Sequence, residues 1–220
     1  MGNINTAIIC AAGKGSRLGH NIPKSLVEVG GKTVINWQLE ALEEIRNVVV
    51  VVGYKKEYVI NEILQHRDNV TIVVNKDWEM TNTAYSLSLA CELVDGIVLT
   101  IDGDTIFDKD QVVKMIQHKK VIGVTKPMSD QAVFVIVNKD NKVIEFTREI
   151  NTGYEWTGMS VMPSEIYRGR NNCFVYQIIE KNFPVHAQYI DLVEIDTQED
   201  LDRANEWIIK NCHKEGVIYE

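Results

Sequence analysis

The chain has 220 residues, 45% of them hydrophobic and 25% charged, a globular composition with enough residues for one large core. Its net charge of -8 provides no broad cationic field, so neither nucleic acid nor an anionic membrane is expected as a partner. The four cysteines form no CxxC pair, no apolar run approaches the roughly 18 residues that cross a bilayer, and no signal-peptide pattern opens the chain, so we expect one cytoplasmic domain over residues 1–220.

In the first half of the chain, β-rich runs alternate with segments of helical period. Strands are predicted at residues 6–11, 48–52, 70–74 and 97–101, with helices at residues 34–45, 58–64 and 83–93. The unbroken β-branched run at 48–52 is typical of a strand that is covered on both faces. The alternation therefore predicts an α/β fold, with a mostly parallel sheet between two layers of helices.

The pattern changes after about residue 120. Strands are predicted close together at residues 121–125, 132–137, 143–146 and 154–162, with a turn at Asn138–Asn141. We expect this part to add a small antiparallel flap or lobe. Near the C-terminus, Thr197 and Asp200 form a capping-box pattern that predicts the start of a helix.

A glycine-rich segment follows the first predicted strand and contains Gly13, Gly15, Arg17 and then Pro23-Lys24. Glycines let backbone N–H groups approach a phosphate chain closely. The segment lacks the Walker A pattern, and its GxGxxxG spacing differs from the dinucleotide GxGxxG. A simple glycine turn is the alternative without a ligand. The basic residues instead favour a nucleoside triphosphate loop, in which Arg17 and Lys24 meet phosphate oxygens.

The run Ala-Ala-Gly-Lys-Gly-Ser-Arg-Leu at residues 11–18, followed by Pro23-Lys24, resembles the signature of the sugar-phosphate nucleotidyltransferase superfamily. The resemblance implies a Rossmann-like three-layer αβα fold with a mostly parallel mixed sheet. It also implies that Arg17 holds the triphosphate and that Lys24 contacts the phosphates at the reaction centre. The residues it places against the nucleotide are Ala11, Ala12, Gly13, Gly15, Asn82, Thr83 and Asp102.

Two acidic segments resemble the metal sites of that superfamily. The resemblance implies that Asp104, after the strand at 97–101, and Asp196, in Glu-Ile-Asp-Thr, bind magnesium. It also implies that Asp104 is a catalytic residue together with Arg17 and Lys24. Two carboxylates about 4 Å apart repel each other by roughly 4 kcal/mol at an effective dielectric constant near 20. They would therefore converge only around a cation or a shared proton. If the two aspartates bind no metal, Asp104 is simply a residue at the end of a strand and Asp196 is a residue that caps a helix.

The short length and the Asn82-to-Leu87 segment most resemble small bacterial cytidylyltransferases of the phosphocholine type, which implies CTP as the nucleotide, with UTP second. Glu149 is not followed by the lysine and proline of hexose-specific relatives, and residues 129–133 contain no aromatic residue for a choline cage. The acceptor is therefore expected to be a small phosphorylated or phosphonate compound, used to decorate a capsule or another surface glycan.

Together these patterns predict a nucleotidyltransferase with Mg2+ as cofactor, which transfers NMP from CTP or another NTP to the acceptor and releases pyrophosphate. A UTP- or dTTP-dependent sugar-1-phosphate nucleotidyltransferase is an alternative. A non-catalytic nucleotide-binding regulatory module is another, although the presence of Arg17, Lys24, Asp104 and Asp196 together argues against it. The sequence leaves the oligomeric state open, a homodimer included.

Overall fold

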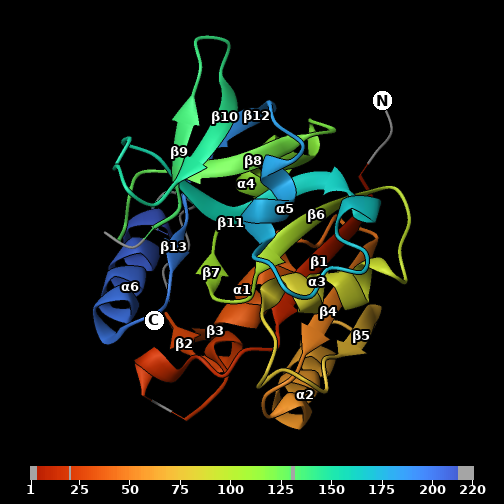
Figure 1. Ribbon diagram of the computed structural model, residues 1–220. Coiled ribbons are helices and arrows are strands. Elements are labelled where there is room, and N and C mark those ends of the chain that lie inside the picture. Colours follow the sequence, from red (N-terminus) through yellow and green to blue (C-terminus); the bar gives the residue numbers. More distant parts are fainter. Residues whose placement is uncertain (1–3, 20, 130–131, 213–220) are drawn as a thin grey trace.

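A nine-stranded mixed sheet runs through the protein, in the order β5-β4-β1-β6-β11-β8-β12-β10-β9 (Figure 1). The computed structural model describes residues 4–19, 21–129 and 132–212. The strands of the large sheet are β1 (Thr6–Ala11), β4 (Asn47–Val52), β5 (Val70–Val74), β6 (Ile97–Asp102), β8 (Val121–Thr125), β9 (Phe134–Val137), β10 (Lys142–Thr147), β11 (Glu155–Pro163) and β12 (Val185–Tyr189). Four short strands form two small sheets: β2 (Glu28–Val29), β3 (Lys32–Thr33), β7 (Thr105–Ile106) and β13 (Val193–Glu194).

Helices cover both faces of the sheet, as the alternating pattern predicts. The α-helices are α1 (Val34–Ala41), α2 (Lys56–His66), α3 (Thr83–Cys91), α4 (Lys109–Ile116), α5 (Val175–Glu180) and α6 (Gln198–Cys212), and the 3₁₀ helices are η1 (Ser16–Leu18), η2 (Lys24–Leu26) and η3 (Ser164–Ile166). Within β1 and β4, Ile9 and Val50 pack in the cluster that contains α1, α2 and α4. Ile8 and Val49 pack in the other, with α3 and α5. Alternate residues of one strand thus enter opposite cores, which explains the unbroken apolar runs.

The N-terminal half of the sheet is parallel. β1 pairs in parallel with both β4 and β6, and β4 pairs in parallel with β5. The carboxyl ends of β1 and β6 therefore lie next to each other, Cys10 opposite Asp102. In an open α/β sheet, this edge is where ligands bind.

The C-terminal half of the sheet curls into a ring of five strands. β11 lies antiparallel to β6 and β8, β12 lies parallel to β8, and β10 and β9 form an antiparallel hairpin. The ring closes because Phe134 of β9 also pairs with Glu155 of β11. The predicted antiparallel flap is thus confirmed in the β9–β10 hairpin, with its turn at Asn138–Asn141. The parallel strand β12 was not predicted, and no α-helix was predicted at α4 or α5.

The last segment returns to the N-terminal half. β13 pairs with β7, the short strand that follows β6, and α6 packs over β2 through Ala204 and Ile208. The predicted capping box is confirmed: the Thr197 N–H donates to Asp200 Oδ2 at 2.8 Å, and the Asp200 N–H donates to Thr197 Oγ1 at 3.3 Å. Among the described residues, no helix is both long and apolar enough to span a membrane.

The core of the parallel half gives a prediction for stability. Leu99 in β6 is 0% exposed, so Leu99→Ala should lower the free energy of unfolding by about 2–5 kcal/mol. Leu93→Ala, at a leucine that is 64% exposed, should change it by less than about 0.5 kcal/mol. Urea denaturation of both variants measures the difference. Equal losses would contradict the placement of β6 in the centre of the sheet.

Candidate active site

A cavity of about 270 Å³ opens at the carboxyl ends of β1 and β6. Main-chain and small side-chain groups of the glycine-rich loop form one wall, and acidic side chains form another. Its described lining consists of Cys10, Ala11, Gly13, Gly15, Arg17, Lys24, Ser25, Thr83, Asp102, Gly103, Asp104 and Asp196. The cavity therefore lies at the sheet edge where the fold predicts a ligand.

Two glycines make this cavity possible. Gly15 has φ +64°, and a Cβ there would lie 2.2 Å from Lys24 Cγ, so only glycine lets the lysine side chain pass along the loop. A Cβ at Gly103 would lie 2.6 Å from the Cys10 carbonyl oxygen, so glycine also permits the ends of β6 and β1 to approach. Glycine is therefore required at both positions by a close approach, to a lysine side chain at Gly15 and to the backbone of β1 at Gly103.

Lys24 lies between two aspartates inside the cavity. Its Nζ is 2.7 Å from Asp104 Oδ2 and 2.5 Å from Asp196 Oδ1, and all three side chains are largely buried. Burial lowers the pKa of Lys24, but the charges of Asp104 and Asp196 and their hydrogen bonds outweigh it and hold the pKa above its ordinary value. Lys24 is therefore a cation at physiological pH and neutralises part of the acidic pair.

The backbone holds the two aspartates together. Asp104 lies between β6 and β7, and Asp196 directly follows Ile195 after β13. Pairing of β7 with β13 joins the two segments, and the Ile195 N–H donates to the Asp104 carbonyl at 2.9 Å. Asp200 of the capping box also accepts from the Asp196 N–H at 3.2 Å. The carboxylates thus converge through main-chain hydrogen bonds that involve neither side chain's charge.

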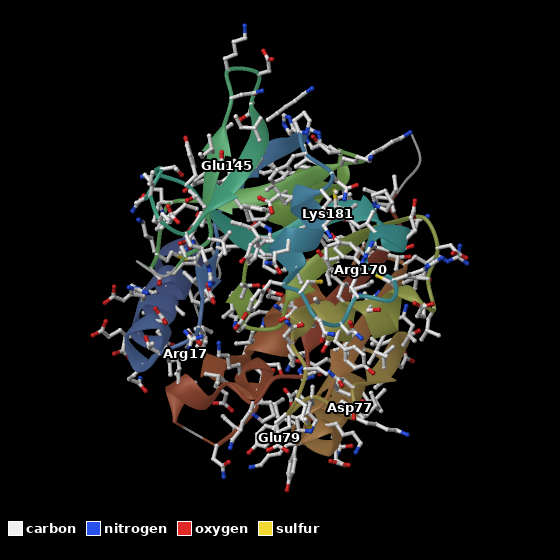
Figure 2. The ribbon with its side chains drawn as sticks, viewed as in Figure 1. Arg17, Asp77, Glu79, Glu145, Arg170 and Lys181 are labelled. Atoms are coloured by element: carbon white, nitrogen blue, oxygen red, sulfur yellow. The ribbon has the colours of Figure 1, made fainter. Side chains whose placement is uncertain are left out.

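Arg17 and Asp102 complete the polar lining in different ways. Arg17 forms an ion pair with Asp196, although its side chain is 75% exposed and extends from the loop toward the segment before α6 (Figure 2). Asp102 ends β6 against Gly158 of β11, where a Cβ would lie 2.3 Å from Asp102 Oδ2. Burial and the charge of Asp104 raise the pKa of Asp102 to about 8. The raised pKa favours the protonated form of Asp102, in which its carboxyl can donate a hydrogen bond.

Most of the predicted site residues come together in this cavity. Nine of the eleven line it: Ala11, Gly13, Gly15, Arg17, Lys24, Thr83, Asp102, Asp104 and Asp196. Ala12 does not, because its side chain belongs to the α3 core and its carbonyl accepts from the Tyr54 N–H at 3.0 Å. It lies one residue beyond the end of β1.

Asn82 also lies outside the lining and serves the start of α3. Its Oδ1 accepts from the N–H groups of Ala84 and Tyr85 at 3.1 and 3.4 Å, and its Nδ2 donates to the Cys173 carbonyl at 3.0 Å. This is an N-cap role, for which asparagine is among the best residues. The geometry therefore gives no support to a contact between Asn82 and a pyrimidine edge.

Sequence reasoning missed Cys10, Ser25 and Gly103 in the lining. Ser25 is 2% exposed, and its hydroxyl has no hydrogen-bond partner among the described residues. Buried hydroxyls are nearly always paired, so an unpaired one in a polar cavity is expected to meet a ligand. The sequence feature that could have predicted Ser25 as a site residue is its position directly after Pro23-Lys24.

The donors present suit a divalent cation that is shared with a substrate. Asp104 and Asp196 offer hard carboxylate oxygens, which Mg2+ prefers. The described residues contain no group of three or more His, Cys, Asp or Glu that could hold a metal. Phosphate oxygens and water would therefore have to complete the coordination, which is common for Mg2+ in nucleotide sites.

The shared lysine gives a prediction for stability. Lys24→Met removes the ion-pair partner of Asp104 and leaves Asp196 with only the exposed Arg17, so the free energy of unfolding at pH 7 should fall by about 3 kcal/mol. Added Mg2+ should restore part of this loss, because it binds the freed carboxylates in the folded state only. Thermal and urea denaturation with and without Mg2+ measure both effects.

A matched control exists at Lys109, which bridges Glu43 and Glu44 at 2.7 and 3.1 Å but is 48% exposed. Lys109→Met should lower the free energy of unfolding far less than Lys24→Met does, and the loss should not respond to Mg2+. If the two methionine variants lose equal stability, the acidic pair does not depend on Lys24.

Known proteins resemble this chain in sequence. Residues 7–151 match the family model of the MobA-like NTP transferase domain. The chain is 27% identical over 196 residues to the bifunctional protein GlmU of Methanococcus vannielii, an alignment covering 86% of this chain and 46% of the relative. It is 32% identical over 160 residues to the choline-phosphate cytidylyltransferase of Streptococcus pneumoniae, covering 70% of this chain and 68% of that protein. It thus spans about half the length of the GlmU relative.

The fold also matches that of a solved structure. The inositol-1-phosphate CTP transferase from T. maritima superposes with a TM-score of 0.79 and 23% identity, over 99% of both chains. This likeness confirms the predicted three-layer αβα architecture with its mixed sheet. The family model covers more than half of the chain, and the matched residues include the glycine-rich loop and Lys24, which line the cavity. The chain therefore belongs to the MobA-like NTP transferase family.

Proposed function

We propose that this protein transfers CMP from CTP to a small phosphorylated acceptor and releases pyrophosphate. The observation that carries the proposal is the cavity in which Lys24, Asp104 and Asp196 meet beside the glycine-rich loop. Cations, carboxylates and backbone N–H groups that converge at one sheet edge are the groups that phosphoryl chemistry requires.

In the proposed reaction, an oxygen of the acceptor phosphate attacks the α-phosphorus of CTP. A new P–O bond forms while the bond from the α-phosphorus to the leaving pyrophosphate breaks. The attacking oxygen is already anionic near neutral pH, so no general base is needed, and catalysis consists of positioning and charge stabilisation. Lys24 neutralises charge where the two anions meet. Arg17 reaches the triphosphate, since its guanidinium lies at the open side of the cavity.

A divalent cation, which we propose to be Mg2+, would supply further positive charge to the phosphates when bound. Asp104 and Asp196 are the residues proposed to hold it, in agreement with their oxygen donors and their shared contact with Lys24. The loop residues Ala11, Gly13 and Gly15 and the Ser25 hydroxyl would meet the nucleotide, because they line the same cavity.

CTP is proposed because two of the relatives described above are named as CTP or cytidylyl enzymes. Thr83 is the polar residue of the Thr81–Thr83 segment that lines the cavity, so it is the residue proposed to approach the base. We further propose a non-hexose acceptor, and surface-glycan decoration as the purpose. A sugar-1-phosphate uridylyl- or thymidylyltransferase is the second candidate.

The decisive assay is pyrophosphate release with four NTPs and a panel of phosphorylated acceptors. Asp104→Asn and Asp196→Asn should each lower turnover at least about a hundredfold, equivalent to roughly 2.7 kcal/mol, because each removes a proposed cation ligand. Asp95→Asn, at an aspartate whose side chain is 96% exposed, should leave turnover unchanged.

Several results would contradict the proposal. Full activity in excess EDTA, or wild-type turnover in both active-site variants, would exclude the metal role. Fast turnover of glucose 1-phosphate with UTP would contradict both the choice of CTP and the choice of a non-hexose acceptor. Tight nucleotide binding, with no pyrophosphate released from the NTP in the presence of any acceptor, would favour a non-catalytic regulatory module.

A further inference from the structure

An arginine lies over two stacked aromatic rings beside the cavity. The rings of Phe174 and Tyr176 are 5.7 Å apart and nearly parallel, with 12° between their planes. The guanidinium carbon of Arg148 lies 6.0 Å from the Phe174 centroid and 5.8 Å from the Tyr176 centroid. We call these three residues the arginine platform. Arg148 directly follows β10, and the two aromatic residues lie at the start of α5.

The first contact between the platform and the cavity runs through α3. The Cys173 carbonyl accepts a hydrogen bond from Asn82 Nδ2 at 3.0 Å. Cys173 immediately precedes Phe174, and Asn82 immediately precedes Thr83, which lines the cavity. The platform is therefore close to the α3 side of the cavity.

A second contact runs through the ring of strands. Tyr176 packs on Phe146 at 5.9 Å, and Phe146 packs on Trp156 at 5.7 Å. Trp156 lies two residues before Gly158, which contacts Asp102 in the cavity. In Figure 1, α5 lies between the β9–β10 hairpin and α3, in agreement with both contacts. The platform is thus connected to the cavity through two chains of contacts, although none of its three residues is among the described residues that line it.

The charge of Arg148 is free to bind a ligand. Its side chain is exposed, and no carboxylate among the described residues forms an ion pair with it. By contrast, Arg17, Arg168 and Arg203 each have an aspartate partner. The aromatic rings limit the directions in which the Arg148 guanidinium can point, while its N–H donors remain available. Such a planar fork matches two oxygens of a carboxylate or a phosphate.

We propose that the arginine platform selects acceptors that carry a second anionic group besides the phosphate that reacts. This inference rests on the proposed function, because it places the acceptor between the reaction centre and the hairpin. A carboxylate or second phosphate pairs with Arg148 and adds affinity. A quaternary ammonium group at the same place meets a like charge, so phosphocholine is a poor acceptor.

The test uses two probe pairs that differ in one carboxylate. O-phosphoserine is compared with phosphoethanolamine, and the longer 4-phosphonobutyrate with butylphosphonate. Calorimetry measures the affinity of each probe for the protein loaded with Mg2+ and the α,β-methylene analogue of CTP, which cannot release pyrophosphate. Binding of the analogue itself, measured first, reports on the nucleotide site alone.

In at least one pair, the member with the carboxylate should bind ten times more tightly or better. Arg148→Ala should reduce that ratio to about one by weakening only this member, and Arg148→Lys should retain part of it because lysine keeps the charge without the fork. Arg170→Ala is the matched control. This exposed arginine precedes α5 (Figure 2), donates to the Ile166 carbonyl and contacts no aromatic ring among the described residues. It should leave the ratio unchanged.

Three results would overturn the proposed role of the arginine platform. They are equal affinity of the two probes within both pairs, no binding of either carboxylate probe, or an affinity ratio that Arg148→Ala does not change. The proposed function is judged separately, by analogue binding and by pyrophosphate release on the wider panel. Selectivity for small acceptors without a second anion, together with normal turnover, would refute the platform and keep the transferase.

Discussion

The site depends on one ammonium group that two carboxylates share. Asp104 and Asp196 approach the same Lys24 Nζ at 2.7 and 2.5 Å. Two carboxylates that share one ammonium group lie close together, and without that cation they would repel each other by several kcal/mol. Other features of the region serve this contact. Gly15 leaves space for the lysine stem, and the β7–β13 pairing fixes both acidic segments. A nucleotide-binding edge of this kind is therefore acidic and basic at once, and its net charge is small.

The local part of this arrangement was predictable from the sequence, whereas the long-range part was not. The glycine-rich loop and Pro23-Lys24 lie within one short segment, so their spacing alone predicted a phosphate site, and the cavity lies there. That Asp196 meets Asp104 depends on the pairing of two-residue strands, which no periodicity reveals. The resemblance to a family supplied that residue. Likewise α5 has six residues and shows too few turns for a helical pattern.

Ala12 and Asn82, the two predicted site residues outside the described cavity lining, have other contacts in the fold. Asn82 precedes an apolar helical segment, and asparagine before a helix is a strong N-cap signal, which its bonds to Ala84 and Tyr85 follow. Ala12 follows Ala11 at the end of β1, where neighbouring residues point to opposite faces of the sheet. One alanine therefore lines the cavity while the next packs against α3.

The two halves of the sheet divide the proposed task. The family model covers residues 7–151, which include the loop, Lys24 and Asp104 but exclude Asp196 and α5. The shared segment thus contains the residues proposed to handle the triphosphate. The arginine platform, which is proposed to meet the acceptor, lies across the end of the matched segment, since Arg148 is within it and α5 is beyond it. A family that keeps one nucleotide chemistry can change its acceptor here without disturbing the parallel sheet, since β11 connects the halves through β6.

Charge also constrains how a nucleotide reaches this site. The protein carries -8 overall, and its long-range field disfavours a polyanion, but at physiological ionic strength that field is screened beyond about 8 Å. Inside this distance Arg17 and Lys24 act directly, yet each already contacts Asp196. A bare triphosphate would have to compete with the aspartate for both cations. A triphosphate that brings its own divalent cation gives the aspartates a replacement partner and releases Arg17 and Lys24 for phosphate oxygens. Under the proposed function, the ion pairs of Arg17 and Lys24 with Asp196 therefore favour entry of nucleotide and metal together.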